Sequence, residues 1–353
     1  MSGGVDSSVV AALLAEAGCE VVGIAMKLWN WPEVGGNLQH DRRCCSADAF
    51  AAARLVARRM DFPFYVIDLA EEFRRAVIDD FINEYRSGKT PNPCVQCNTR
   101  IKWSTLEARA QELGADFLAT GHYARIERNG PEGSSRLLSG VDTSRDQSYF
   151  LWGVSRISLA RTIFPLGELT KHDVRALARE LGLPNADRPE SREICFVADD
   201  DYGRFLREHG GVSDSPGDVV GSGGQIVGRH EGIVFYTIGQ RKGVGAHGRP
   251  VYVTALDPQT NTVHIGGDDD LLHREFEVED AHWISIDPPS QSLAARVKIR
   301  YRHTPAAAEI FPEDGKLRIA FSEAQRAITP GQSAVFYDGD IVLGGGRIVR
   351  VMV

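Results

Sequence analysis

The sequence lacks long apolar runs and any excess of basic residues. No hydrophobic stretch approaches the ~20 residues that span a membrane, and the first ten residues, MSGGVDSSVV, lack the basic segment and apolar core of a secretory signal. Its 40 lysines and arginines face 48 aspartates and glutamates, a formal net charge of −8. This balance excludes a basic surface over the whole chain but not a local one that binds nucleic acid. We therefore expect a cytoplasmic protein that does not associate with membranes.

Cysteine is scarce as well, with six residues in a chain of 353. In a cytoplasmic protein, thiols are more often buried, catalytic or metal-binding than joined in disulfides. Cys94 and Cys97 form a Cys-x-x-Cys motif, and two cations that follow, at positions 100 and 102, favour a reactive thiolate. Half of a zinc site is the alternative for this motif, although no second Cys-x-x-Cys or His-x-x-x-His follows it. A third thiol, Cys195, is by itself typical of a small buried side chain.

Hydrophobic periodicity predicts that the first 200 or so residues alternate between strands and helices. Short apolar strands are expected at residues 20–26, 64–69 and 116–122, and helices at 7–17, 46–60 and 103–113. Such alternation is typical of an α/β fold with a parallel sheet and helices on both faces. Near residue 212 the pattern changes to Gly-rich turns and short strands. We therefore predict three domains, at residues 1–205, 206–272 and 273–353.

The remainder of the chain is predicted to be β-rich. IVFYTIG (233–239) is expected to be one strand of a small central domain. VYVTALD (251–257) and TVHIGG (262–267) are expected to follow it as strands. From about residue 275 onward, six apolar segments are separated by turns that contain Pro, Gly or Asp, and the pairs Asp314-Gly315 and Asp338-Gly339 are hairpin signals. Strands at this spacing are typical of a sandwich or of a small C-terminal β-barrel, which is our prediction.

A loop rich in glycine and serine, Ser2-Gly3-Gly4-Val5-Asp6-Ser7-Ser8, leads into the first predicted helix. Its glycines let the backbone approach a ligand closely, and its hydroxyls and the helix N-terminal N–H groups suit phosphate oxygens. The Gly-Lys-Ser/Thr ending of a P-loop is missing, so the loop has no lysine of its own for the phosphates. A flexible chain start is the alternative for the glycines alone. Because such a loop should follow a central strand, we expect the native chain to begin upstream of Met1.

Four cations alternate with apolar residues near the start of the last domain. Because side chains alternate along a strand, residues 296–302 are expected to place Arg296, Lys298, Arg300 and Arg302 on one face. An ordinary solvated barrel surface is the alternative, but an anionic partner would relieve the repulsion among four like charges. Arg241-Lys242 is a second candidate basic patch.

The phosphate loop resembles that of the ATP-pyrophosphatase superfamily, and a longer series of segments is similar to the tRNA 2-thiouridylase family of tRNA-uridine sulfurtransferases. The segments run in family order from residue 1 to about 305: SGGVDSS, AMKLWN, RRCCS, PNPCVQCNTRIKW, ATGHYA, DQSYFL, GLP, EICF, YTIGQRKG and RYRHTP. Each alone is a weak signal, but the ordered set is specific. The resemblance implies an adenine-nucleotide α-hydrolase-like domain with a parallel sheet, a small β-rich central domain and a C-terminal β-barrel.

The resemblance also implies an activity, the ATP-dependent 2-thiolation of the wobble uridine (position 34) of tRNA. In this transferase reaction the uridine C2 oxygen is adenylated, and sulfur comes from a cysteine persulfide. The implied cofactors are ATP and Mg²⁺, which Asp6 would help to hold. The implied partners are the tRNA anticodon stem-loop and a sulfur-donor or sulfur-relay protein.

Individual site residues follow from the matched segments. Cys97 matches the family nucleophile, and Cys195 matches the persulfide carrier. The nucleotide-binding positions are Ser2, Gly3, Gly4, Val5, Asp6, Ser7, Ser8, Met26 and Gly121. The positions that face the target base are Asn92, Pro93 and Cys94, and the tRNA-contact positions are His122, Arg145, Asp146, Gln147, Arg300, Tyr301 and Gln332.

Cys94 departs from the pattern of many members, which carry Asp there and use it in the chemistry. Members with Cys resemble sulfurtransferases whose [4Fe–4S] cluster sits on three cysteines and keeps one iron open for sulfide. Cys94, Cys97 and Cys195 would then be the cluster ligands, and the sequence leaves the cluster and the persulfide relay both open. Two other classes are a synthetase that adenylates a small metabolite, which needs no cysteine pair, and a non-catalytic RNA-binding protein with a relic nucleotide site.

Overall fold

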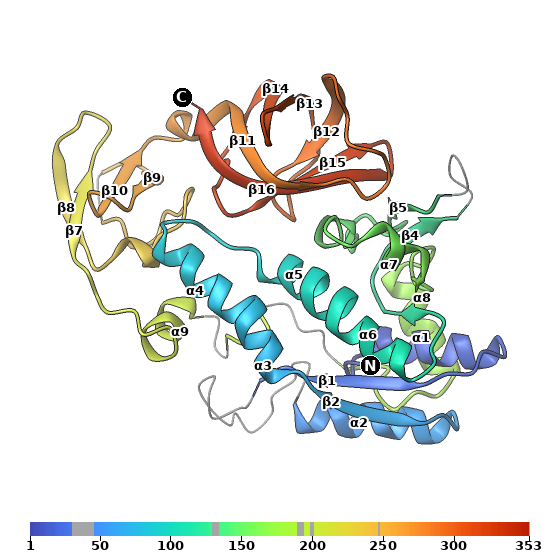
Figure 1. Ribbon diagram of the computed structural model, residues 1–353. Helices are drawn as coiled ribbons and strands as arrows, with labels where there is room; N and C mark the ends of the chain where they lie inside the picture. Colours follow the sequence, from blue (N-terminus) through green and yellow to red (C-terminus); the bar gives the residue numbers. More distant parts are fainter. Residues whose placement is uncertain (30–45, 129–133, 189–193, 198–200, 246–247, 353) are drawn as a thin grey trace. The chain divides into compact units, whose positions relative to one another are not determined.

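The computed structural model describes residues 1–29, 46–128, 134–188, 194–197, 201–245 and 248–352 (Figure 1). These residues form two compact units, neither of which is a continuous stretch of chain. The first unit consists of Met1–Val77, Cys94–Asp201 and Asp340–Val342, and the second of Ile78–Pro93, Tyr202–Gly339 and Leu343–Val353.

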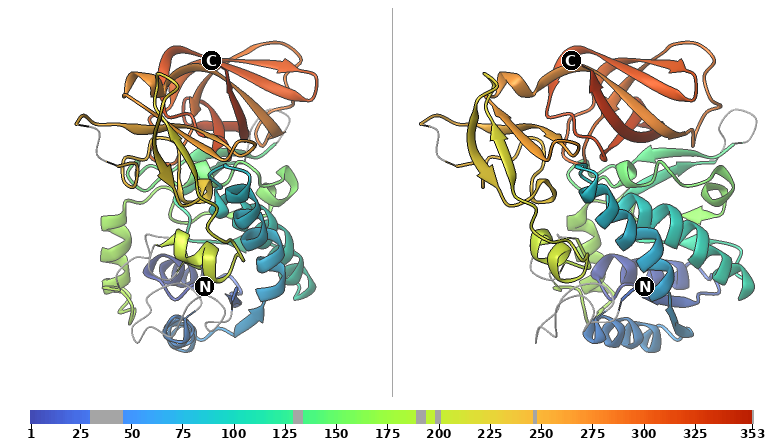
Figure 2. Two further views of the ribbon diagram at one scale, coloured as in Figure 1. Left: turned by 90° about the vertical axis from the view of Figure 1, so that its left-hand side faces the viewer. Right: turned by 60° about the vertical axis from the view of Figure 1, so that its left-hand side comes forward.

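The first unit contains the predicted parallel β-structure. Strand β1 (Gly23–Lys27) pairs in parallel with β2 (Phe64–Asp68), and β3 (Leu118–Ala119) pairs in parallel with β6 (Thr162–Ile163). Helix α2 (Ala47–Arg59) comes between β1 and β2 in the sequence and contacts both strands, near the bottom of each view of Figure 2. The α/β class is confirmed. Among the described residues these pairs are two separate sheets, and a strand ahead of the phosphate loop stays a prediction.

Helix α1 (Val5–Glu16) fixes the loop that precedes it. Its buried Val9 and Ala12 pack with Val174 and Ala178 of α8 (Lys171–Glu180) in one apolar cluster. Burying a valine side chain stabilises a fold by roughly 1.5–3 kcal/mol, so this cluster holds the two helices together. The predicted helix at 7–17 is therefore present and begins two residues earlier, inside the phosphate loop.

The other helical elements are short. In the first unit they are α3 (Ala70–Phe73), α5 (Pro93–Gln96, which begins one residue ahead of that unit), the π-helix η3 (Cys97–Leu106), α6 (Glu107–Glu112), the 3₁₀-helix η5 (Ser148–Phe150) and α7 (Arg156–Ala160), while the π-helix η2 (Arg74–Ile78) runs from it into the second. In the second unit they are α4 (Asp79–Arg86), α9 (Tyr202–Glu208) and the 3₁₀-helices η6 (Ile233–Phe235) and η7 (Asp269–Leu271).

A four-stranded sheet of order β8-β7-β10-β9 begins the β-rich part of the second unit. Its strands are β7 (Gly217–Val220), β8 (Ile226–His230), β9 (Tyr252–Asp257) and β10 (Thr262–Gly266). The prediction of a strand at 233–239 is wrong, because this segment starts with the 3₁₀-helix η6. The N–H groups of Phe235 and Tyr236 donate to Gly232 and Ile233, and these local hydrogen bonds replace a strand ladder.

The C-terminal strands form a closed six-stranded barrel of order β11-β14-β13-β12-β15-β16, drawn in orange to red in Figure 1. A β11–β16 pairing closes it, which confirms the predicted barrel and removes its open edges. The predicted turn at Asp314-Gly315 is a two-residue hairpin, with Glu313 opposite Lys316. The strands are β11 (Leu272–His282), β12 (Leu293–Lys298), β13 (Ala306–Glu313), β14 (Lys316–Arg326), β15 (Ser333–Asp338) and β16 (Ile341–Met352).

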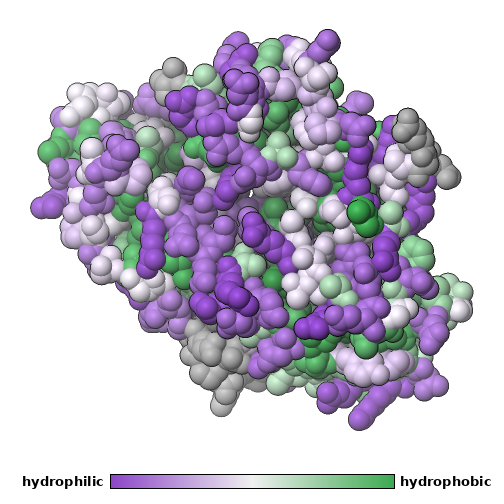
Figure 3. Space-filling view, in the orientation of Figure 1, coloured by the Kyte–Doolittle hydropathy of each residue, from purple (hydrophilic) through white to green (hydrophobic). Residues whose placement is uncertain are grey.

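A hairpin of the first unit, β4 (Ala124–Glu127) with β5 (Arg136–Ser139), extends from the start of β16 through pairs at Ile341 and Val342. On the face drawn in Figure 3, hydrophilic residues predominate and hydrophobic ones are interspersed among them. No helix in the described part of the chain is long and apolar enough to cross a membrane.

Candidate functional site

The phosphate loop is held against the first turn of α2. Gly3 has a φ of +73°, and a Cβ on it would lie 2.2 Å from the carbonyl oxygen of Ala49. A side chain at this position is therefore excluded both by backbone conformation and by space. Ser46, the N-cap of α2, accepts a hydrogen bond from the Ala49 N–H at 3.1 Å and fixes the turn on which Gly3 rests.

Hydroxyl groups close the loop over the start of α1. The Oγ atoms of Ser7 and Ser8 each donate to the carbonyl of Gly4 at 3.1 Å, and the Ser2 N–H donates to Ser7 Oγ at 3.1 Å. Gly4 is the N-cap and has no side chain to satisfy the helix N–H groups. The first turn of α1 therefore presents backbone donors and the positive end of a helix dipole, the geometry that binds anions.

Asn185 and Arg188, which are distant from the loop in sequence, donate hydrogen bonds to it. Asn185 is buried, and its Nδ2 donates to the Gly3 carbonyl at 3.0 Å and to Ser8 Oγ at 2.8 Å. Arg188 donates to the same carbonyl at 3.2 Å. The sequence analysis missed both residues, and the only signal near them was the matched segment GLP, which directly precedes Asn185.

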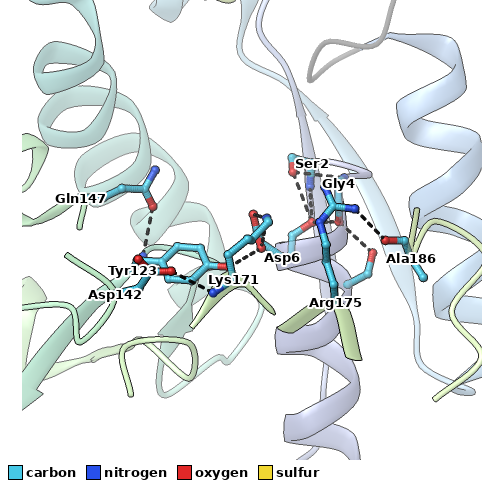
Figure 4. Close-up of polar contacts among 11 residues, drawn as sticks. Ser2, Gly4, Asp6, Tyr123, Asp142, Gln147, Lys171, Arg175 and Ala186 are labelled. Atoms are coloured by element: carbon cyan, nitrogen blue, oxygen red, sulfur yellow. Dashed lines mark hydrogen bonds and ion pairs between the residues drawn. The ribbon is translucent and has the colours of Figure 1, made fainter. Parts of the chain in front are cut away.

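Asp6, in the first turn of α1, lies in a charged cluster with residues from two other segments (Figure 4). Lys171 Nζ contacts both Asp6 carboxylate oxygens, at 2.7 and 2.8 Å, and the hydroxyl of Tyr123 donates to Oδ1 at 2.8 Å. The backbone N–H of Lys171 donates to Asp142 at 2.9 Å. Lys171 was not predicted from the sequence, where 165 positions separate it from Asp6.

Two further predicted nucleotide positions belong to the same unit. Gly121 is packed against the loop so closely that a Cβ on it would lie 3.0 Å from Asp6 Cβ and 3.1 Å from the Ser7 nitrogen. Met26 is half-buried in β1. The contact places Gly121 beside the phosphate loop, and the nucleotide-binding role of both residues stays a prediction.

The cysteine motif lies at the start of a helical run, where α5 continues directly into the π-helix η3. Cys94 is exposed, and Cys97, the first residue of η3, is partly exposed. Asn98 is buried behind them and donates through Nδ2 to the carbonyl of Phe150 at 3.0 Å. Both thiols are therefore accessible on a helix start whose next residue is anchored in the interior.

Cys195 is partly exposed and lies in the described segment 194–197 of the same unit. The next residue, Phe196, is buried and packs edge-on against Phe73 at 5.8 Å, which anchors the segment. Within the described ranges, no three His, Cys, Asp or Glu side chains are grouped so that they could hold a metal ion. The zinc site and the cluster both stay predictions, and Cys44 and Cys45 lie outside the described residues.

His122 is buried between aromatic rings. Its ring lies 5.4 Å from that of Trp103 and 6.0 Å from that of Phe164, and Lys102 Nζ is 3.4 Å from its Nε2. Because an ammonium group only donates, Nε2 accepts and the proton lies on Nδ1, which donates to Thr120 Oγ1 at 2.8 Å. Burial holds the pKa of His122 well below its usual range, and Lys102 lowers it further. The imidazole is therefore neutral at neutral pH, which suits a hydrogen-bond acceptor or a stacking surface better than an acid.

The predicted tRNA-contact segment Arg145-Asp146-Gln147 begins at the end of a turn that the Arg145 N–H closes on the Asp142 carbonyl, and it leads into η5. Asp146 accepts from the N–H groups of Gly140 and Ser148 at 3.0 and 3.1 Å, and Gln147 Oε1 accepts from the Tyr123 N–H at 3.1 Å. Two of the three side chains thus hold this segment in place, and Arg145 is half-buried. Their contact with tRNA stays a prediction.

In the second unit, Gln332 supports the segment that leads to the cysteine motif. Its Nε2 donates to the carbonyls of Thr90 and Pro91 at 2.9 and 3.1 Å, and the Thr90 N–H donates to Pro330 at 2.9 Å. Asn92 and the buried Pro93 follow immediately. The side chain predicted to touch tRNA therefore has a structural contact within its own chain.

Gln332→Glu should destabilise the protein by about 1–3 kcal/mol, because the variant replaces two N–H donors with carboxylate oxygens that face carbonyls. The midpoint of urea unfolding measures this loss. Gln291→Glu, at an exposed position of the same unit, is the matched control and should leave the midpoint unchanged. Wild-type stability combined with weaker tRNA binding would instead mean that Gln332 acts only on tRNA.

The prediction of one strand face with four cations is wrong in part. Strand β12 ends at Lys298, and residues 299–302 form bends and turns. Arg296 donates to the carbonyl of Pro305 at 2.7 Å, and Arg300 donates to that of Arg326 at 2.8 Å. Lys298 lies over the ring of Tyr301, with 5.6 Å from Nζ to the ring centroid. Burial alternates as predicted through Val297 and Ile299, but the ladder hydrogen bonds stop earlier, so the cations do not share one strand. Arg241 and Lys242 are exposed.

Comparisons with known proteins match the whole chain. Residues 1–199 fit a family profile described as the "tRNA methyl transferase HUP domain", residues 203–267 a "PRC-barrel domain" of the same series, and residues 273–348 an "Aminomethyltransferase beta-barrel domain". Proteins named "tRNA-specific 2-thiouridylase MnmA" are 48% identical in Geobacter metallireducens, 47% in Solibacter usitatus and 45% in Clostridium perfringens. These alignments cover 99–100% of this chain and 96–98% of the relatives. The profile is named for methyl transfer, whereas these full-length relatives are all named as thiouridylases.

Proposed function

Because this chain belongs to the family of tRNA-specific 2-thiouridylases, we propose that it replaces the C2 oxygen of the wobble uridine of tRNA with sulfur at the expense of ATP. The observation that carries this proposal is the presence, in one compact unit, of an anion-binding loop at the start of α1 and of three cysteines, Cys94, Cys97 and Cys195. A synthetase that acts on a small metabolite needs the loop but no cysteines. A tRNA sulfurtransferase needs the loop and the cysteines.

The loop suits the activation step. The C2 carbonyl of uridine is urea-like and unreactive, so its oxygen must first become a leaving group. In this step the uridine oxygen attacks the α-phosphorus of ATP, a P–O bond between the α- and β-phosphates breaks, and pyrophosphate leaves. The backbone donors at the start of α1 hold the leaving phosphates, and Asp6 lies where it can take part in binding Mg²⁺, which prefers oxygen ligands.

The cysteines suit the sulfur step. The terminal sulfur of a persulfide on Cys195 attacks C2 of the adenylated base, and the C2–O bond breaks as AMP leaves with its electron pair. The Cys97 thiolate attacks the Cys195 sulfur, so that the S–S bond of the persulfide breaks and a Cys97–Cys195 disulfide forms. The transferred sulfur is thereby reduced and the two thiols are oxidised. A thiol reductant then restores them, and a sulfur-donor or relay protein reloads Cys195.

The base must leave its stack to reach these groups. A wobble uridine lies in a single-stranded loop, so the unstacking cost is modest. Asn92, Pro93 and Cys94 face this base in the proposal, and the neutral His122 offers an aromatic surface or a hydrogen-bond acceptor. Arg145, Arg300 and Tyr301 contact the anticodon stem-loop, with the exposed Arg241 and Lys242 as further cations for its phosphates.

The three cysteines also define a second version of the sulfur step. Cys94, where many members carry Asp, adds a third thiolate, and three thiolates are the ligand set of a [4Fe–4S] cluster with one open iron. Such a cluster would supply a sulfide for the same attack on C2. Cys94→Ser separates the two versions, because the relay uses only Cys97 and Cys195.

The test is a thiolation assay on protein purified without oxygen. With tRNA, ATP·Mg²⁺ and a sulfur source, we expect 2-thiouridine by mass spectrometry of the digested tRNA, and one AMP released per sulfur incorporated. Thiolation without AMP release, or AMP release that needs no tRNA, would contradict the proposed function. Iron content and the visible spectrum, compared between wild type and Cys94→Ser, distinguish the versions: an iron-free, colourless and fully active protein supports the relay.

A further inference from the structure

The phosphate loop lacks the lysine that P-loops place at the end of their glycine-rich segment. The structure brings a lysine to the loop from elsewhere. Lys171 Nζ lies 2.7 and 2.8 Å from the two carboxylate oxygens of Asp6, which is the second residue of α1 (Figure 4). The ammonium group therefore contacts a side chain of the first turn of α1, where the phosphates would bind.

Several contacts fix the position of Lys171. It is the first residue of α8, whose N-cap Thr170 and N3 residue Asp173 form a reciprocal capping box. Its N–H donates to Asp142, and its side chain is only 10% exposed. The ammonium group is thus directed at the loop by the backbone of α8, and the apolar cluster shared with α1 holds that helix in place.

Charge explains why a lysine is needed there. Asp6 places a carboxylate in the first turn of α1, beside the donors that would bind a polyanion. An unpaired carboxylate would repel a triphosphate, and no cation lies within the segment Ser2–Ser8 to offset it. Lys171 cancels this charge, and its ammonium group has three rotatable donors, so it can turn from a carboxylate to a phosphate oxygen.

We propose that Lys171 is a catalytic residue that binds the β- and γ-phosphates of ATP and stabilises the departing pyrophosphate. When the bond between the α- and β-phosphates breaks, negative charge grows on the β-phosphate oxygen that formed the bridge. Lys171 Nζ donates to this phosphate, and Asp6 is the residue that would help to hold Mg²⁺ there. The inference rests on the ATP-dependent function proposed above and deepens it, because it supplies the cation that the loop itself lacks.

Binding of ATP and AMP to Lys171→Met tests the proposal, because AMP has no β- or γ-phosphate. We expect the affinity for ATP to fall roughly 10- to 100-fold, as for loss of a charge-assisted hydrogen bond, and that for AMP to stay within about twofold. Unchanged AMP binding also shows that the variant is folded. Arg179→Met removes a cation from the exposed face of the same helix and should change neither affinity. Equal loss for both nucleotides would overturn the proposal.

A second comparison separates phosphate contact from mere neutralisation of Asp6. The effect of Lys171→Met on ATP binding is measured again in the Asp6→Asn background, in EDTA, so that no metal contact of Asp6 enters. If Lys171 touches the phosphates, the fold-loss persists. If it disappears, Lys171 only offsets Asp6 and the proposal is wrong. A wild-type protein that binds ATP no better than AMP would instead contradict the proposed function, since the loop would then not hold the outer phosphates.

Discussion

Cys97→Ser is expected to form no 2-thiouridine above background, a loss of roughly a thousandfold or more, on the scale that follows removal of an enzymatic nucleophile. Serine keeps the shape of the side chain but is a far weaker nucleophile towards a persulfide sulfur. The phosphate loop is untouched, because its hydrogen bonds involve Ser2, Gly4, Ser7, Ser8 and Asn185. Mixing the variant with tRNA and ATP should therefore give a single burst of about one pyrophosphate per site, followed by no turnover.

Cys19→Ser is the matched control for this result. Cys19 is an exposed thiol of the same unit, next to the end of α1, and the proposed reaction does not use it. This variant should thiolate tRNA at the wild-type rate. Sustained thiolation by Cys97→Ser would show that Cys97 is not the nucleophile, and loss of the pyrophosphate burst would mean that Cys97 also serves the activation step.

Gly3→Ala is expected to remove most of the adenylation activity. Alanine is disfavoured at a φ of +73°, and its methyl group would lie 2.2 Å from the Ala49 oxygen. The loop must therefore shift away from α2, and a displacement of about 1 Å in a substrate-positioning group can lower a rate roughly a hundredfold. Pyrophosphate release in a single turnover measures the effect. The unfolding midpoint, measured in parallel, shows whether the fold itself survives.

Gly18→Ala supplies the control, because Gly18 has a nearly identical φ of +79° at the other end of α1 and nothing within 4 Å of its Cβ position. It shares the backbone strain but not the contact. We expect a small loss of stability and an unchanged rate of pyrophosphate release. If Gly3→Ala released pyrophosphate as fast as Gly18→Ala, the contact with α2 would have no part in shaping the loop.

Features coded by neighbouring residues were predictable from the sequence. The phosphate loop is one continuous segment, and its glycines, hydroxyls and helix start are all visible there. The same is true of the Cys-x-x-Cys motif and of the Asp314-Gly315 turn, which forms the expected hairpin. In each case the signal lies in neighbouring residues, although the loop is also held by distant ones such as Asn185.

Contacts between distant segments were not predictable. Nothing near Lys171 indicates that it meets Asp6, since its position depends on how α8 packs against α1. The prediction that the strand continues to residue 302 was wrong for a related reason. Its alternating burial is real as far as Ile299, yet a strand also needs a partner, and the pairing with β15 ends at Lys298 opposite Val335. Hydrophobic periodicity predicts which side chains are buried, but it does not predict where the pairing with a neighbouring strand ends.

The interleaved make-up of the two units has a consequence for how the protein is made. The first unit includes residues 340–342, where Asp340 accepts from Arg125 at 2.8 Å and its carbonyl accepts from the Ser139 N–H at 2.8 Å. A growing chain on the ribosome carries the phosphate loop from its first residues and Cys97 soon afterwards, but it cannot complete the unit that holds them until almost all of the chain has been synthesised. A chain truncated before Asp340 therefore carries the phosphate loop and Cys97 but lacks these contacts of the unit that holds them.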